Sequence, residues 1–260
     1  MLYYEKIIND INNDWIVFIH GLGGSVKTWK KQIDYYKDKD KYNILTIDLP
    51  GHGKSQNVDD LNKRTPENIL LEIEEVLDEN KIESAHFEGM SLGTIILLFL
   101  CAYKPERIKS AIMAGGIISL SMKVQFYIAF MNIIKHFSSH QFIYNTFSKI
   151  IMPKKNHQLS RKLFIRESAN LKRQEFLYWA NFLKEAQNPN KLIKKINENK
   201  LKILYIMGSE DHIFLKNTLK STKLMNDTDY KIIEHCGHVC NLEKYTEYNK
   251  LSENFMLSCA

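Results

Sequence analysis

A serine lies at the centre of the glycine-flanked pentapeptide Gly89–Gly93 (Gly-Met-Ser-Leu-Gly). The G-x-S-x-G pattern places a serine on a sharp turn between a strand and a helix, a nucleophile elbow. The run Ala85–Glu88 before it is typical of a strand, and the apolar run Ser91–Tyr103 is typical of a helix. The N-terminus of such a helix directs free N–H groups at a reacting oxygen. Ser91 is therefore the expected nucleophile.

A base and an acid that could activate this serine follow much later in the chain. His238 stands beside Gly237 on a predicted loop, where its imidazole could take the serine proton and later give it to a leaving group. Glu210 and Asp211 lie on the loop before it, and either carboxylate could orient the histidine. Both acids could instead be solvated loop charges. The order serine, acid, histidine is one in which such triads occur.

The segment His20–Gly24 (His-Gly-Leu-Gly-Gly) ends the first strongly apolar strand. Attack on an acyl carbon creates an oxyanion, and losing one of the backbone N–H donors that stabilise it costs about 3 kcal/mol or more. The amides of Leu22 and Leu92 are the candidate donors of an oxyanion hole. For the ring of His20 we expect a structural hydrogen bond that holds the loop.

Predicted strands alternate with predicted helices along most of the chain. Short β-branched and aromatic runs predict strands at Trp15–His20, Asn43–Asp48, Ser84–Glu88, Ile108–Ala114, Leu201–Met207 and Tyr230–Glu234. Helical spacing or turn signals predict helices at Thr28–Tyr36, Pro66–Leu77, Ser91–Tyr103 and Tyr245–Leu257. This alternation favours the α/β class, with a mostly parallel central sheet covered by helices on both faces.

The alternation fails between residues 117 and 195. This stretch is rich in Phe, Tyr, Met, Ile and Lys, with helical runs around Val124–Ile134 and Gln174–Lys184. An insertion of this size between two core strands predicts a helical cap. The expected organisation is thus a core of residues 1–116 and 196–260 with a cap of residues 117–195. The aromatic and methionine side chains of the cap would form an apolar pocket.

Composition is that of an ordinary globular protein, with 44% hydrophobic and 25% charged residues in 260. The net charge of +6, from 36 Lys+Arg and 30 Asp+Glu, is spread along the chain and favours anionic substrates only slightly. No nucleic-acid motif is recognised. The N-terminus does not resemble a signal peptide, and the most apolar stretch, Ala111–Ile134, is interrupted by Gly and Lys, so no integral membrane segment is expected.

Four cysteines occur without the spacing of a zinc site: Cys101, Cys236, Cys240 and Cys259. Free thiols in a reducing cytoplasm are the expected state. No metal or organic cofactor is expected, and the only partner expected is a small-molecule substrate.

Four motifs in order give the chain a resemblance to the α/β-hydrolase superfamily that spans nearly its whole length. They are His20–Gly24, Asp48–Ser55 (Asp-Leu-Pro-Gly-His-Gly-Lys-Ser), Gly89–Gly93 and Gly237–Glu243. The second is especially specific and looks like a structural loop of capped members. The resemblance implies a catalytic triad of Ser91, His238 and Asp211, because Asp211 closes a Gly-x-x-Asp pattern. It also implies that the Leu22 and Leu92 amides form the oxyanion hole.

The expected activity is hydrolysis of a carboxylic ester or thioester of a small to medium, partly apolar substrate through an acyl-enzyme on Ser91. Fold and triad do not fix the substrate. Carbon–carbon bond hydrolysis or a lyase reaction with the same triad is the alternative, and a catalytically inactive binding protein is a third. A haloalkane dehalogenase is disfavoured, since it needs a carboxylate in the elbow.

Glu88 is an unusual residue for a buried strand and must be paired or lie at the mouth of the site.

Overall fold

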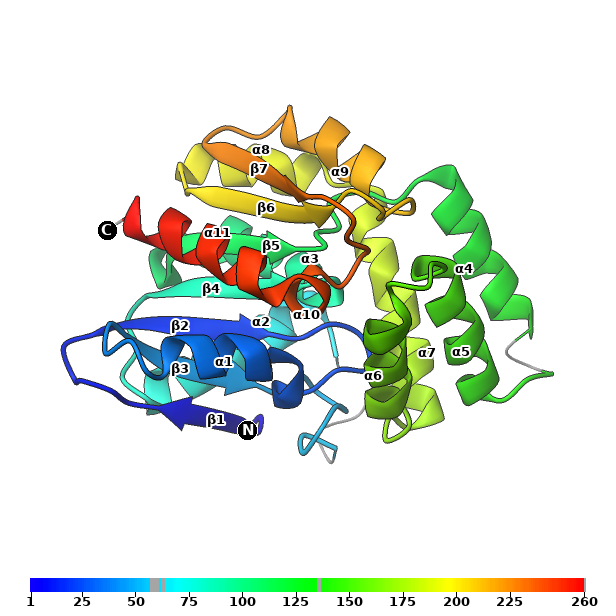
Figure 1. The fold of residues 1–260 in the computed structure, drawn as a ribbon, viewed down its shortest axis with the longest axis horizontal. Coiled ribbons are helices and arrows are strands. Elements are labelled where there is room, and N and C mark those ends of the chain that lie inside the picture. The colour runs from blue at the N-terminus through cyan, green and yellow to red at the C-terminus, as the bar shows by residue number, and fades with distance from the viewer. Residues whose placement is uncertain (57–60, 62–63, 135–136, 260) are drawn as a thin grey trace.

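The computed structural model describes residues 1–56, 61, 64–134 and 137–259. In this part of the chain seven strands form one sheet, in the order β1-β3-β2-β4-β5-β6-β7 (Figure 1). The pairs are parallel except for β1 with β3. The strands are β1 (Tyr4–Ile7), β2 (Asp14–Ile19), β3 (Tyr42–Ile47), β4 (Ala85–Met90), β5 (Ile108–Ala114), β6 (Ile203–Gly208) and β7 (Thr228–Ile233).

The six predicted strands correspond to β2–β7, and the predicted mostly parallel sheet is confirmed. The antiparallel edge strand β1 was not predicted. Its four residues include exposed Glu5 and Lys6, so the sequence has no buried run to mark it. Strands β3 and β4 are buried throughout, as expected for strands covered on both faces.

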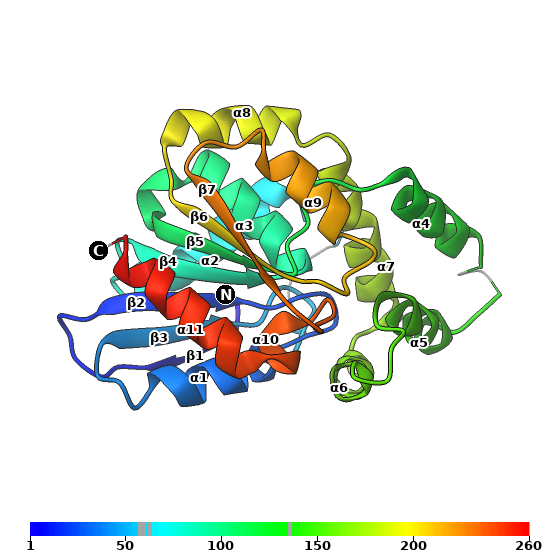
Figure 2. The same cartoon turned by 45° about the horizontal axis from the view of Figure 1, so that its top comes forward.

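Helices cover both faces of the sheet. Figures 1 and 2 show α1 and α11 on one face and α2, α3 and α8 on the other. The helices of this core are α1 (Lys30–Tyr36), α2 (Pro66–Glu79), α3 (Leu92–Tyr103), α8 (Asn190–Asn199), α9 (Leu215–Thr222), α10 (Cys240–Glu243) and α11 (Tyr245–Leu257), with short 3₁₀ turns η1 (Val26–Trp29) and η3 (Pro105–Arg107). Helix α3 is buried over all but its last residue, which makes it the central helix of the fold.

Between β5 and β6 the chain leaves the sheet and forms a group of helices beyond the carboxyl ends of the parallel strands (Figure 1). These are α4 (Met122–Ile134), α5 (His140–Ile151), α6 (Gln158–Ser168), α7 (Arg173–Phe182) and the 3₁₀ segment η4 (Leu183–Gln187). The two predicted helical runs match α4 and α7 with η4, whereas α5 and α6 were not predicted. The expected boundary at residues 195 and 196 falls inside α8, which packs against α3.

No helix in the described ranges is long and apolar enough to cross a membrane.

Candidate active site

Three loops at the carboxyl edge of the sheet bring Ser91, His238 and Asp211 into one hydrogen-bonded chain. Ser91 Oγ lies 2.8 Å from Nε2 of His238. Nδ1 of the same ring lies 2.7 Å from Oδ2 of Asp211. Since a carboxylate only accepts hydrogen bonds, Nδ1–H donates to Asp211, and Nε2 is left to accept the serine proton. His238 and Asp211 are buried, while Ser91 is partly exposed and can be reached by a ligand.

Ser91 sits in a backbone conformation that side chains rarely adopt, with φ of 51° and ψ of −113°. Two glycines make this turn possible. A Cβ at Gly93 would lie 2.4 Å from the carbonyl oxygen of Ile19, and one at Gly89 would lie 2.9 Å from the carbonyl oxygen of Gly93. The glycines of the pentapeptide therefore allow α3 to approach β2 and β4, as their position predicts.

Asp211 is fixed by its own loop. Its Oδ1 accepts hydrogen bonds from the backbone N–H of Ile213 (3.3 Å) and of Phe214 (3.0 Å). Gly208 lets the loop that carries Asp211 approach the loop that carries His238, because a Cβ there would lie 2.1 Å from the carbonyl oxygen of Gly237. The ring of Phe214 lies 4.9 Å from the His238 ring and covers it.

The peptide between Ser91 and Leu92 is oriented through its carbonyl group. The Ser91 oxygen accepts hydrogen bonds from both the N–H (2.9 Å) and the hydroxyl (2.6 Å) of Thr94. In a trans peptide the N–H points away from the carbonyl oxygen. The Leu92 N–H, at the first turn of α3 where no helical acceptor exists, is thus directed to the opposite side of that peptide.

The peptide between Gly21 and Leu22 is held in the same way. Its carbonyl oxygen accepts from the Gly24 N–H (2.9 Å) and from Nδ1–H of His20 (2.8 Å), which directs the Leu22 N–H away from both donors. An ideal Cβ at Gly21 would lie 3.3 Å from Cβ of Ser91, so this turn passes directly beside the serine. The two amides expected to stabilise an oxyanion therefore belong to peptides that are both fixed by hydrogen bonds close to Ser91.

The following peptide, Leu22–Gly23, is pinned at both of its polar groups. Its carbonyl oxygen accepts a hydrogen bond from the Tyr144 hydroxyl (2.8 Å), and its N–H donates to Nε2 of His52 (3.0 Å). Tyr144 is a buried residue of α5, and only a glycine at position 23 leaves room for it, since a Cβ there would lie 2.4 Å from its oxygen. The sequence gives no local signal for this contact.

His20 has the structural role expected for it. Nε2 of its ring accepts the N–H of Leu49 (3.0 Å), which joins the 20–24 loop to the 48–55 loop. Asp48 adds to this link by accepting the N–H groups of Val26 (2.7 Å) and Lys54 (2.8 Å). Burial lowers the pKa of His20 and lowers that of His52 further. Both rings are therefore neutral, as their acceptor roles require.

Glu210, the rival acid, points away from His238 towards the inserted helices. Its carboxylate accepts hydrogen bonds from Asn156 (2.9 Å) and from His157 (2.8 Å) and pairs with Lys154 (2.9 Å). The hydrogen bond from Asn156, followed by that from Lys154, lowers the pKa of Glu210 to about 2. Asp211 alone of the two acids reaches His238.

Glu88 is paired and does not lie at the mouth of the site. It is buried on β4, where it accepts hydrogen bonds from the hydroxyls of Tyr248 (2.7 Å) and Ser252. Burial raises the pKa of Glu88 to about 7.

Cys236 is also buried, and burial raises the pKa of its thiol. Within the described ranges, no group of three or more His, Cys, Asp and Glu side chains is placed to hold a metal ion.

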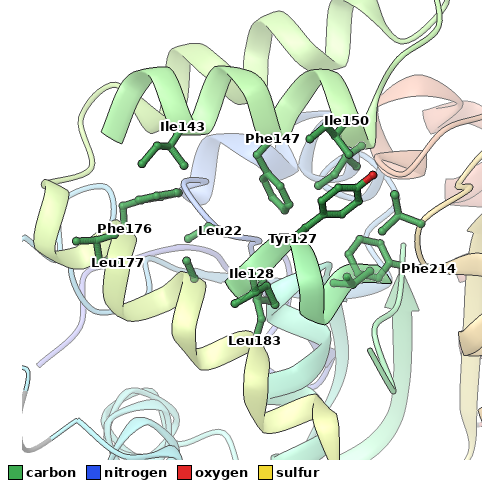
Figure 3. Close-up of a pocket in the computed structure, with 14 residues that line it drawn as sticks. Leu22, Tyr127, Ile128, Ile143, Phe147, Ile150, Phe176, Leu177, Leu183 and Phe214 are labelled. Atoms are coloured by element: carbon green, nitrogen blue, oxygen red, sulfur yellow. The ribbon is translucent and has the colours of Figure 1, made fainter. Parts of the chain in front are cut away.

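An apolar pocket lies between the inserted helices and the core (Figure 3). Leu22 and Phe214 line it from the core loops, and the inserted helices supply most of the rest. Phe214 and Tyr144 are site residues that the sequence did not reveal, because no motif marks them.

The match of residues 14–245 to the family model described as alpha/beta hydrolase fold agrees with this geometry. The chain belongs to the alpha/beta hydrolase fold family. Within this family the curated relatives match only part of the chain. 3-Oxoadipate enol-lactonase 1 of Acinetobacter baylyi is 34% identical over 101 residues, 39% of this α/β-hydrolase and 36% of that protein. A 2-hydroxy-6-oxononadienedioate/2-hydroxy-6-oxononatrienedioate hydrolase of Paraburkholderia phymatum is 29% identical over 106 residues, 39% of this chain and 35% of that protein. These matches thus span about a third of each relative.

Solved structures extend the likeness of this α/β-hydrolase over its whole length. A carboxylesterase structure from Nitrososphaera gargenis superposes with a TM-score of 0.82 at 16% identity, covering 99% of this chain and 94% of that one. The enol-lactonase of Burkholderia xenovorans has a TM-score of 0.77 at 17% identity, covering 98% of this chain and 96% of that one. At such identities the likeness is one of fold.

Proposed function

We propose that the protein is a serine hydrolase that cleaves a carboxylic ester or thioester of a small to medium, partly apolar substrate. The hydrogen-bonded chain from Ser91 through His238 to Asp211 carries this proposal. Its geometry meets the requirements of nucleophilic catalysis: a nucleophile within reach of a base, and a base oriented by an acid.

In the proposed mechanism Ser91 Oγ attacks the acyl carbon as its proton passes to Nε2 of His238. The carbonyl oxygen becomes an oxyanion that accepts hydrogen bonds from the N–H groups of Leu22 and Leu92. His238 then gives the proton to the alcohol or thiol as its bond to the acyl carbon breaks. Water attacks the acyl-enzyme next, with its proton going to His238, and Ser91 regains a proton as the acid leaves.

We also propose that α4–α7 and η4, which lie within the expected cap of residues 117–195, act as a cap domain, and that α8, which crosses the expected boundary, belongs to the core. The position of α4–α7 beyond the carboxyl ends of the strands supports this division (Figure 1). A cap there would cover the proposed triad and exclude bulk water from it.

Carbon–carbon bond hydrolysis with the same triad is a second candidate. The similarity to the Paraburkholderia phymatum hydrolase supports it, as far as a match over a third of that protein can. An enol-lactonase is an ester hydrolase by name, so the Acinetobacter baylyi relative favours the first candidate.

The test compares wild type with Ser91→Ala against a fluorophosphonate probe and short to medium p-nitrophenyl esters. We expect labelling and turnover in the wild type and neither in the variant. Labelling without turnover of any ester would favour the carbon–carbon candidate. Absence of labelling in both proteins would overturn the assignment of Ser91 as nucleophile and favour a binding protein.

A further inference from the structure

The pocket under the inserted helices has an apolar wall. Its lining comes from α4, α5, α7, η4 and two core loops, and none of the described residues that line it is charged. The only side-chain hydroxyl among them is that of Tyr127, and Figure 3 shows the apolar side chains converging on one space. The space between these side chains is about 710 Å³ when the part that is open to solvent is counted.

The pocket adjoins the proposed reaction centre at two residues. Leu22, which lines it, carries one of the proposed oxyanion donors. The ring of Phe214, which also lines it, lies 4.9 Å from the ring of His238 and is tilted by 37° to it. A chain attached to an acyl carbon at Ser91 would enter this space past Leu22 and Phe214, whose side chains are both apolar.

A second pocket shares Leu22 with the first and is also mainly apolar, but its lining includes charged side chains. Met90 and Val239, which line it, are the sequence neighbours of Ser91 and His238. The three charged lining residues belong to η1 and α6: Lys27, Arg166 and Glu167. Lys27 and Arg166 are exposed, so this pocket opens to solvent through a polar rim.

We infer, on the basis of the proposed function, that the substrate is an amphiphilic ester with an uncharged hydrocarbon acyl chain in the first pocket and a polar leaving group in the second. The leaving group departs first, which suits the pocket with the exposed rim. The acyl group stays on Ser91 until water attacks, which suits the pocket whose described lining has no charged residue.

If the acyl chain occupies the first pocket, esters of dicarboxylic acids should be poor substrates. A carboxylate at the far end of the acyl chain would meet no cation among the described lining residues and at most one side-chain hydroxyl, that of Tyr127. Burying a charge without a counter-charge costs several-fold more than one hydrogen bond returns. The two curated relatives described above are named for dicarboxylic acids. The expected substrate class of this protein is therefore different from theirs, despite the shared fold.

The test uses two pairs of esters matched in length. In the first pair, ethyl hexanoate and monoethyl adipate, the charge is at the end of the acid. In the second, hexyl acetate and 6-acetoxyhexanoate, the charge is at the end of the alcohol. We expect kcat/KM for ethyl hexanoate to exceed that for monoethyl adipate by about 100-fold or more, as burial of an unpaired charge requires. The second pair should differ by less than about tenfold, because a charged end there meets a polar rim.

A substitution in the pocket provides an independent readout. Leu177→Arg places a cation among the lining residues and should narrow the hexanoate-to-adipate ratio by about tenfold or more, since it offers the carboxylate a partner. Leu177→Met, which keeps the pocket apolar, should leave the ratio unchanged.

Four outcomes are distinguishable. Similar hydrolysis of hexanoate and adipate esters would overturn the inference, and a penalty confined to the alcohol pair would overturn its orientation. Fluorophosphonate labelling without hydrolysis of ethyl hexanoate would also overturn it, because the pocket would not accept a hydrocarbon chain. Absence of both labelling and hydrolysis would instead be a failure of the proposed function itself.

Discussion

The loop that carries Glu210 and Asp211 supplies the carboxylates of two histidine–carboxylate pairs. The two pairs have similar hydrogen-bond distances but different surroundings. Asp211 holds His238, which faces Ser91, whereas the preceding residue, Glu210, holds His157 at the start of α6. In both pairs a buried imidazole nitrogen lies 2.7 to 2.8 Å from a carboxylate oxygen. Only the first pair has a hydroxyl on the other side of its ring.

The difference shows that the role of a buried histidine is decided by what its second nitrogen faces. Nε2 of His238 accepts from a serine, so the pair can move a proton. The His157 pair instead joins the inserted helices to the core, and its ring also lies near Glu243, at 3.8 Å. Adjacent acids on one turn point in opposite directions, so one supports the proposed chemistry and the other fastens the helices above it.

The largest expected effect is on kcat, and it distinguishes Asp211 from Glu210. Asp211→Asn should lower kcat by about 10³- to 10⁴-fold, because an amide no longer selects the tautomer of His238 that accepts the serine proton. Glu210→Gln is the matched control and should change kcat by less than about threefold. Ester hydrolysis by both variants measures this. Equal losses would show that the two pairs act as one unit.

Glu88 is a buried acid that is not paired with a histidine, and it should affect how the free energy of unfolding depends on pH. Its pKa is raised to about 7, so between the unfolded value of 4.5 and about 7 the folded state binds more protons than the unfolded state. Stability should therefore fall as the pH rises through this window, by about 3 kcal/mol at most. Glu88→Gln should remove this fall.

Denaturant unfolding at pH 5 and pH 8 checks the prediction. Glu210 has the opposite sign, because its pKa is lowered to about 2, and its contribution should be lost as the pH falls below 4.5. A Glu88→Gln variant with the same pH dependence as wild type would contradict the assignment.

Loss of the His157–Glu210 pair should lower the free energy of unfolding but should change kcat little. His157→Gln leaves the partly buried carboxylates of Glu210 and Glu243 short of a well-placed donor, and a cost of about 2 kcal/mol in unfolding free energy is expected. The kcat of the folded variant should stay within about threefold of wild type. Thermal unfolding together with active-site titration separates the two quantities. A large loss of kcat with full labelling by fluorophosphonate would give the pair a catalytic role.

The smallest expected effect concerns the hydroxyl that holds the Leu22–Gly23 peptide. Tyr144→Phe removes one hydrogen bond and should lower kcat by about tenfold while KM changes little, because the Leu22 amide is less well fixed in the transition state. Phe164→Leu, which alters the ring stacked on Tyr144 at 4.5 Å, is the packing control. An equal loss of kcat in the control would make the role of Tyr144 one of packing.

The sequence was sufficient for features that depend on local pattern. The elbow around Ser91 and the six predicted strands follow from glycine spacing and from runs of apolar, β-branched and aromatic residues. The choice between Glu210 and Asp211 rested on resemblance, because adjacent acids have the same local pattern and only the fold orients them. The edge strand β1 could not be predicted, because it has no buried run. Helix α5 was missed although it has a local signal, the capping serine Ser139 followed by apolar residues at helical spacing.

The hydrogen bond from Tyr144 to Leu22 also bears on how far this insertion can be exchanged. Swapping the helices between β5 and β6 for those of another family member would transplant a pocket, but it would also remove the hydroxyl that secures a loop of the core. A chimera of this kind would need a donor at the same place, or it would gain a new substrate pocket and lose rate. In this protein, the inserted helices and the core loop beside Ser91 are joined by this hydrogen bond, so a change in the helices also changes how the loop is held.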